Sequence, residues 1–349
     1  MSRGVKYFRR LLAAFLLAAS LLPLCAARLR IAQTAPSGAG APAASHDPPA
    51  GAPGRLDLPP AVLAEVHQGL DGVFHGDPDA ALPIARSLQS SVPDHPIGYL
   101  LEAEARWWKI YCESCDIRYN LLDAWSRAKL PEDDAYFTAA DRAIQLAEAQ
   151  IAQHETASRH VFAGMGYGLK ARLYGLRGEN RAVARSGVKA REHFLRALQM
   201  SPGLGDALTG VGLYNYLAAA LSPLAKMVRF FMGIPGGNKL EGIRQLEEAM
   251  HTAELTAEEA RFYLARNLRN FDQKYERGAG LLEPLVKQYP ENPSFQLLLG
   301  DIYAKLGRKP QATLRFQAAL NLHPPDAACA ARTRELATSA LASLGHNRP

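Results

Sequence analysis

The sequence predicts an all-α protein, built as a solenoid of antiparallel helix pairs with a C-terminal capping helix. From Ala61 onward, apolar residues recur at helical spacing, and runs of β-branched residues are few. Proline punctuates this pattern at a repeating distance, since Pro290 lies 34 residues before Pro324. Small residues also recur in the units at places where two helices would cross closely. A period of this length is typical of stacked helical repeats.

Residues 1–27 have the three parts of a secretory signal peptide. Four basic residues precede an apolar run over residues 11–24, and small residues follow at 25–27. The apolar run is shorter than the ~20 residues that a membrane-spanning helix needs. We therefore predict export, with cleavage after Ala27, to the periplasm or another part of the cell envelope. The alternative is an uncleaved segment that serves as an N-terminal anchor.

Residues 28–60 are rich in alanine, proline and glycine. They are predicted to form a disordered linker between the export signal and a repeat domain over residues 61–345. The formal charge is +6, and removal of the four basic residues of the signal peptide leaves +2. No block of basic residues with interleaved aromatics is present, so nucleic acid is not an expected partner.

The best-defined repeat spans residues 293–326. The residues that follow one helical-hairpin pattern are Leu299, Gly300, Tyr303, Gly307, Ala312, Phe316, Ala319 and Pro324. Gly300 and Ala312 are small because the two helices of the pair must approach closely there. The preceding unit, residues 259–292, keeps the second-helix positions but has Arg266 where a small residue is usual.

These residues resemble the pattern of the tetratricopeptide repeat (TPR) family. The resemblance is clear at the C-terminal end and looser over the rest of residues 61–324, and residues 327–344 fit a capping helix. It implies a right-handed superhelix whose first helices line a concave groove that binds protein or peptide partners. The groove residues that it implies are Trp107, Tyr263, Asn267, Asn270, Leu297, Asp301 and Lys305. We expect alanine at Tyr263 and Asn267 to weaken partner binding without unfolding the array.

Cysteine and tryptophan residues form a second set of candidates. Cys112 and Cys115 make a C-x-x-C motif, and in an exported protein these two thiols can close a local disulfide or remain incidental. A structural zinc site needs about four ligands, and no second cysteine pair completes one, so no metal is predicted. Cys329 is interpreted as a small buried residue of the capping helix. The adjacent Trp107 and Trp108 are equally compatible with a binding surface and with packing between repeats.

An apolar insertion over residues 214–237 separates two helices of one repeat. Its leucines and aromatics at helical spacing favour packing into the core. The alternative is an exposed flap that contacts a partner or the membrane surface, aided by Lys226 and Arg229. The glycine-rich loop 233–239 lacks the ending of a phosphate-binding loop, so we interpret it as a tight turn before a helix capped by Asn238.

No set of residues assembles a nucleophile, a base and oxyanion donors. The acidic run Glu132, Asp133 and Asp134 is interpreted as the first turn of a helix, where negative charge complements the helix dipole. We therefore predict a non-enzymatic scaffold or adaptor of the bacterial cell envelope, without cofactors, that binds proteins of unknown identity. The alternative is an envelope protein that binds a small ligand, a lipid or the membrane surface through the apolar insertion. The sequence does not define an oligomeric state.

Overall fold

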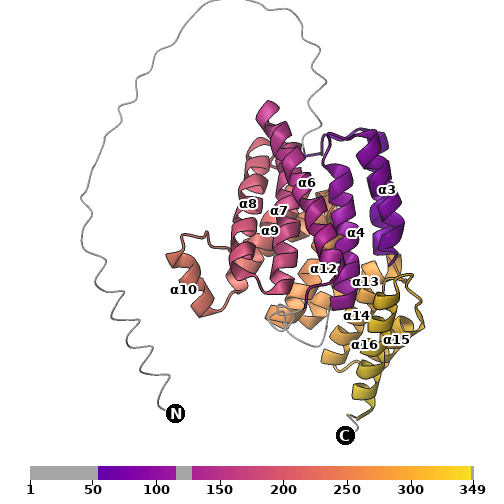
Figure 1. Cartoon of the computed structure of the whole chain (residues 1–349). Helices are drawn as coiled ribbons and strands as arrows, with labels where there is room; N and C mark the ends of the chain where they lie inside the picture. Colours follow the sequence, from indigo (N-terminus) through magenta and orange to yellow (C-terminus); the bar gives the residue numbers. More distant parts are fainter. Residues whose placement is uncertain (1–53, 115–127, 347–349) are drawn as a thin grey trace, which may run out of the picture. The chain divides into compact units, whose positions relative to one another are not determined.

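The computed structural model describes residues 54–114 and 128–346, which belong to one compact unit, Ala50–Pro349. Every regular element in these two ranges is a helix (Figure 1). The helices are α2 (Pro60–Phe74), α3 (Pro78–Ser91), α4 (Ile97–Ser114), α6 (Glu132–Gln153), α7 (Ala157–Arg177), α8 (Asn180–Met200), α9 (Gly205–Ala220), α10 (Pro223–Phe231), α11 (Lys239–Thr252), α12 (Ala257–Asn267), η1 (Leu268–Asp272), α13 (Tyr275–Gln288), α14 (Pro293–Lys305), α15 (Lys309–Asn321) and α16 (Ala327–His346). Residues 1–27, Cys115 and most of the predicted linker lie outside the described ranges.

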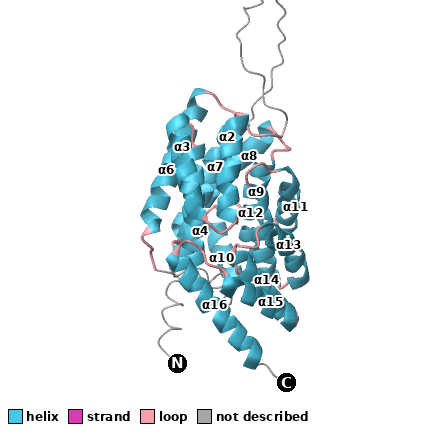
Figure 2. Ribbon diagram, turned by 90° about the vertical axis from the view of Figure 1, so that its right-hand side faces the viewer, coloured by secondary structure: helices cyan, strands magenta, loops and turns pink. Residues whose placement is uncertain are grey.

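The helices pack as successive antiparallel pairs, and the predicted fold class is confirmed. The pairs are α2 with α3, α4 with α6, α7 with α8, α9 with α11, α12 with α13, and α14 with α15. The second helix of each pair also packs on the first helix of the next pair, and α16 caps the last one (Figure 2). The chain is therefore a TPR-like α-solenoid of antiparallel helix pairs.

Close contacts between glycine and phenylalanine join the helices within two of the pairs. A Cβ atom on Gly300 of α14 would lie 2.7 Å from the Phe316 ring of α15. A Cβ atom on Gly164 of α7 would lie 2.8 Å from the Phe194 ring of α8. Any side chain at either glycine would push the two helices apart, because core packing leaves little free space. The small residue of the repeat pattern therefore has the predicted physical role.

The two ends of the repeat array contact each other. The Phe74 ring at the end of α2 lies 5.6 Å from the Tyr289 ring and 6.5 Å from the Phe295 ring, measured between centroids. The side-chain amide of Asn292 donates a hydrogen bond of 3.0 Å to the Phe74 carbonyl oxygen. Gly76, in the α2–α3 turn, has a φ of +87° and lies so close to the Glu291 carbonyl that a Cβ atom would approach it to 3.0 Å. The turn between α2 and α3 therefore packs against the turn between α13 and α14.

A disulfide bond closes the same junction between α4 and α16. Cys112 is bonded to Cys329, at a sequence separation of 217 residues. The prediction of a Cys112–Cys115 disulfide is therefore wrong, because the array bends back until the capping helix lies against α4. Cys329 is buried, as predicted, but it is also a bonding partner.

The end of the predicted linker also differs from the prediction. Residues 54–59 lie against the folded body rather than apart from it. The backbone amide of Leu56 donates to Glu254 at 2.6 Å, and that of Asp57 donates to the Ser158 hydroxyl at 2.7 Å. Leu56 is buried. One large apolar side chain and satisfied backbone amides are sufficient to hold this short segment in place.

We predict that removing the Cys112–Cys329 bond lowers the free energy of unfolding by about 2–4 kcal/mol, because the bond restricts a long loop of the unfolded chain. The double variant Cys112→Ser, Cys329→Ser should unfold at lower urea than the oxidised protein, whereas Cys115→Ser should not. Peptide mapping without reductant checks the connectivity, and recovery of a Cys112–Cys115 peptide instead would contradict it.

Candidate functional site

The concave surface implied by the repeat pattern is filled by the chain's own helices. Five of the seven predicted groove residues are buried, and these are Trp107, Tyr263, Asn267, Leu297 and Asp301. Asn270 is half-buried and Lys305 is exposed. The predicted groove is therefore closed over most of its length, because α2 and α4 pack onto α12 and α14 through contacts such as that between the rings of Trp108 and Phe295.

A half-buried arginine, with 19% of its side chain exposed, stands at the centre of this closed surface. The guanidinium of Arg172, from α7, lies between the rings of Trp107 and Tyr263, at 5.2 Å from each centroid. Its nitrogens lie 2.9 Å from Glu104 and 2.8 Å from Glu259. These five residues, here called the Arg172 cluster, connect α4, α7 and α12. Trp107 also donates a hydrogen bond of 2.8 Å from Nε1 to the Tyr263 hydroxyl.

Burial controls the charge state of the Arg172 cluster. The pKa of Glu259 is raised to about 8, mainly by loss of solvation and also by the nearby Glu104, against the opposing effect of Arg172. Glu259 therefore holds a proton at neutral pH, and the single positive charge of Arg172 faces the Glu104 carboxylate. Such a cluster satisfies a buried cation, as a low-dielectric interior requires.

A carboxyl group with a raised pKa is a typical feature of acid–base catalysis, but this one has no route to a substrate. Glu104, Glu259 and Tyr263 are all buried, and Arg172 is covered by two rings. A catalytic acid must come within hydrogen-bonding distance of the group that it protonates. The arrangement joins helices, and we assign it a structural role.

Two further buried ion pairs have the same role. Arg177 holds Asp133 through two hydrogen bonds of 2.6 Å, which ties the end of α7 to the start of α6. Arg269 donates to Asp301 at 2.7 Å, which ties η1 to α14. Asp133 begins its helix as predicted, whereas Asp301 is bound by the chain itself instead of facing a groove.

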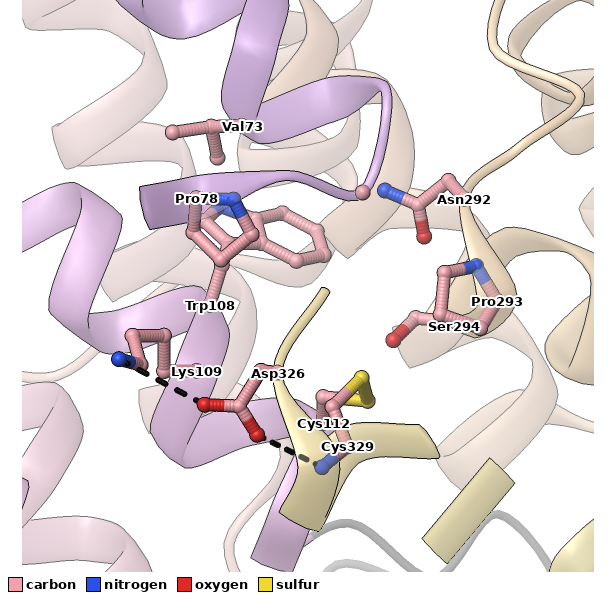
Figure 3. A pocket seen from close by; sticks show the side chains of 11 residues that line it. Val73, Pro78, Trp108, Lys109, Cys112, Asn292, Pro293, Ser294, Asp326 and Cys329 are labelled. Carbon is pink, nitrogen blue, oxygen red and sulfur yellow. Dashed lines mark hydrogen bonds and ion pairs between the residues drawn. A yellow bond between two sulfur atoms is a disulfide. The ribbon is translucent and has the colours of Figure 1, made fainter. Parts of the chain in front are cut away.

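A small cavity lies at the junction that the disulfide closes (Figure 3). Its volume is about 20 Å³, and Trp108, Lys109, Asn292 and Asp326 are among its lining residues. This is room for about one water molecule. Within the described residues, no group of three histidine, cysteine or acidic side chains could hold a metal ion.

The sequence favoured packing of the insertion into the core, and helix α10 contradicts that prediction. Every residue of α10 is at least partly exposed, and the side chains of Phe230 and Phe231 are 77% and 79% exposed. The helices on either side leave no space for it, since a Cβ atom on Gly242 of α11 would lie 2.7 Å from the Gly212 carbonyl of α9. Helix α10 therefore stands outside the closed array, as Figure 1 shows, whereas Tyr216, at the start of the insertion, is buried in the core as predicted.

The glycine-rich loop after α10 is a turn, as predicted. Asn238 caps α11 by accepting a hydrogen bond from the Glu241 amide at 3.2 Å. The Pro235 carbonyl accepts one from Arg229 of α10 at 2.7 Å and one from the Tyr214 hydroxyl of α9 at 2.8 Å. These bonds connect α10 to the solenoid and leave its apolar side chains facing outward.

We predict that Tyr263→Ala lowers the free energy of unfolding by about 3 kcal/mol, because it removes a buried ring from the Arg172 cluster. Tyr263→Phe should lower it by about 1 kcal/mol, since the ring stays but Trp107 loses its acceptor. Urea unfolding followed by circular dichroism measures both. Unchanged stability of the alanine variant would show that the surface is open in solution, as the repeat pattern alone implies.

We also predict a pH-dependent difference between the wild type and Glu259→Gln. The folded-state pKa of Glu259, about 8, lies above its ordinary value of 4.5, so its contribution to stability is fully present below 4.5 and is lost as pH rises through about 8. Glutamine stays neutral, so the variant should gain stability relative to the wild type as pH rises. Urea unfolding at several pH values tests this, and a difference that does not change with pH would refute the assignment.

Comparisons with known proteins give only a distant relationship. No family model matches the chain, and no curated protein matches it. Among solved structures it is similar to a chain in the crystal structure of the APC/C hetero-tetramer Cut9-Hcn1, with 12% sequence identity and a TM-score of 0.34. The similarity covers 82% of this chain and 49% of that chain, so this protein spans about half its length. The TPR-like fold is therefore assigned from the helix pairs and their glycine contacts.

Proposed function

We propose that this protein is a non-enzymatic interaction scaffold of the bacterial cell envelope, and that α10 is its docking element. The observation that carries the proposal is the exposure of Leu224, Phe230 and Phe231 on one short helix. Large apolar side chains gathered on a surface typically mark an interaction site. Elsewhere in the described chain most large apolar residues are buried in two clusters around the helix pairs, and isolated ones such as Met200 and Leu314 are exposed.

The predicted groove is closed, so the interaction site must lie elsewhere on the protein. A partner peptide could reach Trp107 and Tyr263 only if α4 separated from α12, which would break the Arg172 cluster. Helix α10 needs no such opening. Its large apolar side chains are exposed, whereas Lys305 is the one predicted groove residue that is exposed.

The envelope location is supported by the signal-like residues 1–27 and by the covalent closure of the fold. A structural disulfide is typical of exported proteins, and the bond between Cys112 and Cys329 fits an oxidising compartment. Among the described residues, no helix is long and apolar enough to span a membrane.

Site-specific photo-cross-linking in cells tests the docking element. Benzoylphenylalanine at position 231 should give cross-linked products with protein or lipid, because this side chain points away from the solenoid. The matched control is position 314 on α15, where Leu314 is 54% exposed but stands outside the insertion. Products at both positions or at neither would refute α10 as the docking element, provided that circular dichroism shows both proteins folded.

A further inference from the structure

The apolar surface of α10 continues beyond the helix itself. The large apolar residues that are exposed in and beside it are Leu217, Leu224, Met227, Val228, Phe230, Phe231, Met232 and Leu240. The two phenylalanines are adjacent, with ring centroids 5.8 Å apart. A cluster with two aromatic rings at its most exposed point is suited to insert into an apolar medium, where it would recover the free energy of burial.

The charge within residues 214–240 has one sign, although Glu241 directly follows this segment. Residues 214–240 contain Lys226, Arg229 and Lys239 and no acidic residue. Lys239 is held by Asp272 at 2.5 Å, but Lys226 has no ion-pair partner among the described residues. Arg229 uses Nη1 to bind the Pro235 carbonyl and keeps its positive charge. The partner that complements this surface is therefore both apolar and anionic.

Helix α8 extends the basic surface beside α10. Its exposed Arg181, Arg185 and Lys189 recur at every fourth position and have no ion-pair partner in the described part of the chain. The neighbouring Arg191 lies with its guanidinium 5.4 Å from the Tyr214 ring, and Tyr214 holds the loop that follows α10. Figure 1 shows α10 next to α8. The positive charge thus continues from the insertion onto the solenoid.

Two other occupants fit less well. A second copy paired through the same face would bring Lys226 and Arg229 of both copies together, and like charges at close range repel. Residues 28–53 contain only Leu29 and Ile31 as large apolar residues, so this part of the chain has too little apolar surface to cover α10. Neither occupant supplies an anionic group for each basic residue.

We propose that α10 binds the surface of an anionic lipid bilayer, with Leu224, Phe230 and Phe231 among the acyl chains and Lys226 and Arg229 at the lipid phosphates. Amphipathic helices with basic residues beside an apolar face lie in the bilayer interface in this way. The long stem of Lys226 allows its ammonium group to remain at the headgroups while the helix sinks, and Arg229, which is bound to the Pro235 carbonyl, adds positive charge beside it. This inference rests on the proposed docking role of α10 and names its partner.

Vesicle flotation tests the lipid inference with the chain from Arg28 onward, since every described helix lies within the separate unit Ala50–Pro349. The protein should float with vesicles of phosphatidylcholine and phosphatidylglycerol and should bind pure phosphatidylcholine about tenfold or more weakly. The anionic binding should weaken in high salt, because salt screens the headgroup charge.

Three variants separate the contributions. Phe230→Ser with Phe231→Ser should abolish flotation, and Lys226→Gln should weaken it severalfold in low salt, while Leu314→Ser on α15 should float like the wild type. Circular dichroism confirms folding, and all four positions are exposed, so the substitutions do not disturb the core.

The outcomes distinguish this inference from the proposed function. Equal binding to both vesicle types, or flotation that survives the double serine variant, would overturn the lipid inference. Cross-links from position 231 to protein alone, with no flotation, would overturn it while the docking role of α10 stands. Absence of both cross-links and flotation would overturn the two together.

Discussion

The positive charge of Arg172, most of whose side chain is shielded from solvent, is the constraint on which the rest of the arrangement depends. A cation in a protein interior needs partners, and its partners come from two other helices, α4 and α12. Once these helices meet at the guanidinium, the rings of Trp107 and Tyr263 have no route to solvent. The concave surface then becomes core. The site at which a repeat array would ordinarily receive a partner is occupied by the chain's own contacts, and the proposed docking element α10 lies outside the array.

Local features of the fold were predictable, and long-range features were not. The helix pairs, the close helix approach at Gly300 and the cap at Asn238 depend on residues within a few turns of one another, so spacing alone reveals them. The bond between Cys112 and Cys329 depends on the curvature summed over many helix pairs, which no single repeat specifies. The pattern did not mark the Arg172 cluster, because Glu104 and Arg172 have charged neighbours two positions away, as exposed charged residues on a helix commonly do.

Helix α10 shows why hydrophobic periodicity does not distinguish inside from outside. A helix with one apolar face has the same pattern whether that face meets a core or another apolar surface. Whether α10 is buried depends on the space between α9 and α11. The backbones of Gly212 and Gly242 approach so closely that no such space is left. The absence of acidic residues over 214–240 was the readable difference, because a surface helix of a water-facing protein ordinarily carries both signs of charge.

Closure of the array restricts how the number of repeats can change during evolution. In an open solenoid each repeat contacts only its neighbours, so whole units can be gained or lost at the ends or between others. Here a duplicated or deleted pair would carry Cys329 away from Cys112 and Asn292 away from Phe74. The contacts that close the array therefore fix the number of repeats. The insertion between α9 and α11 is free of that restriction, so sequence change can accumulate there and retune binding while the scaffold stays constant.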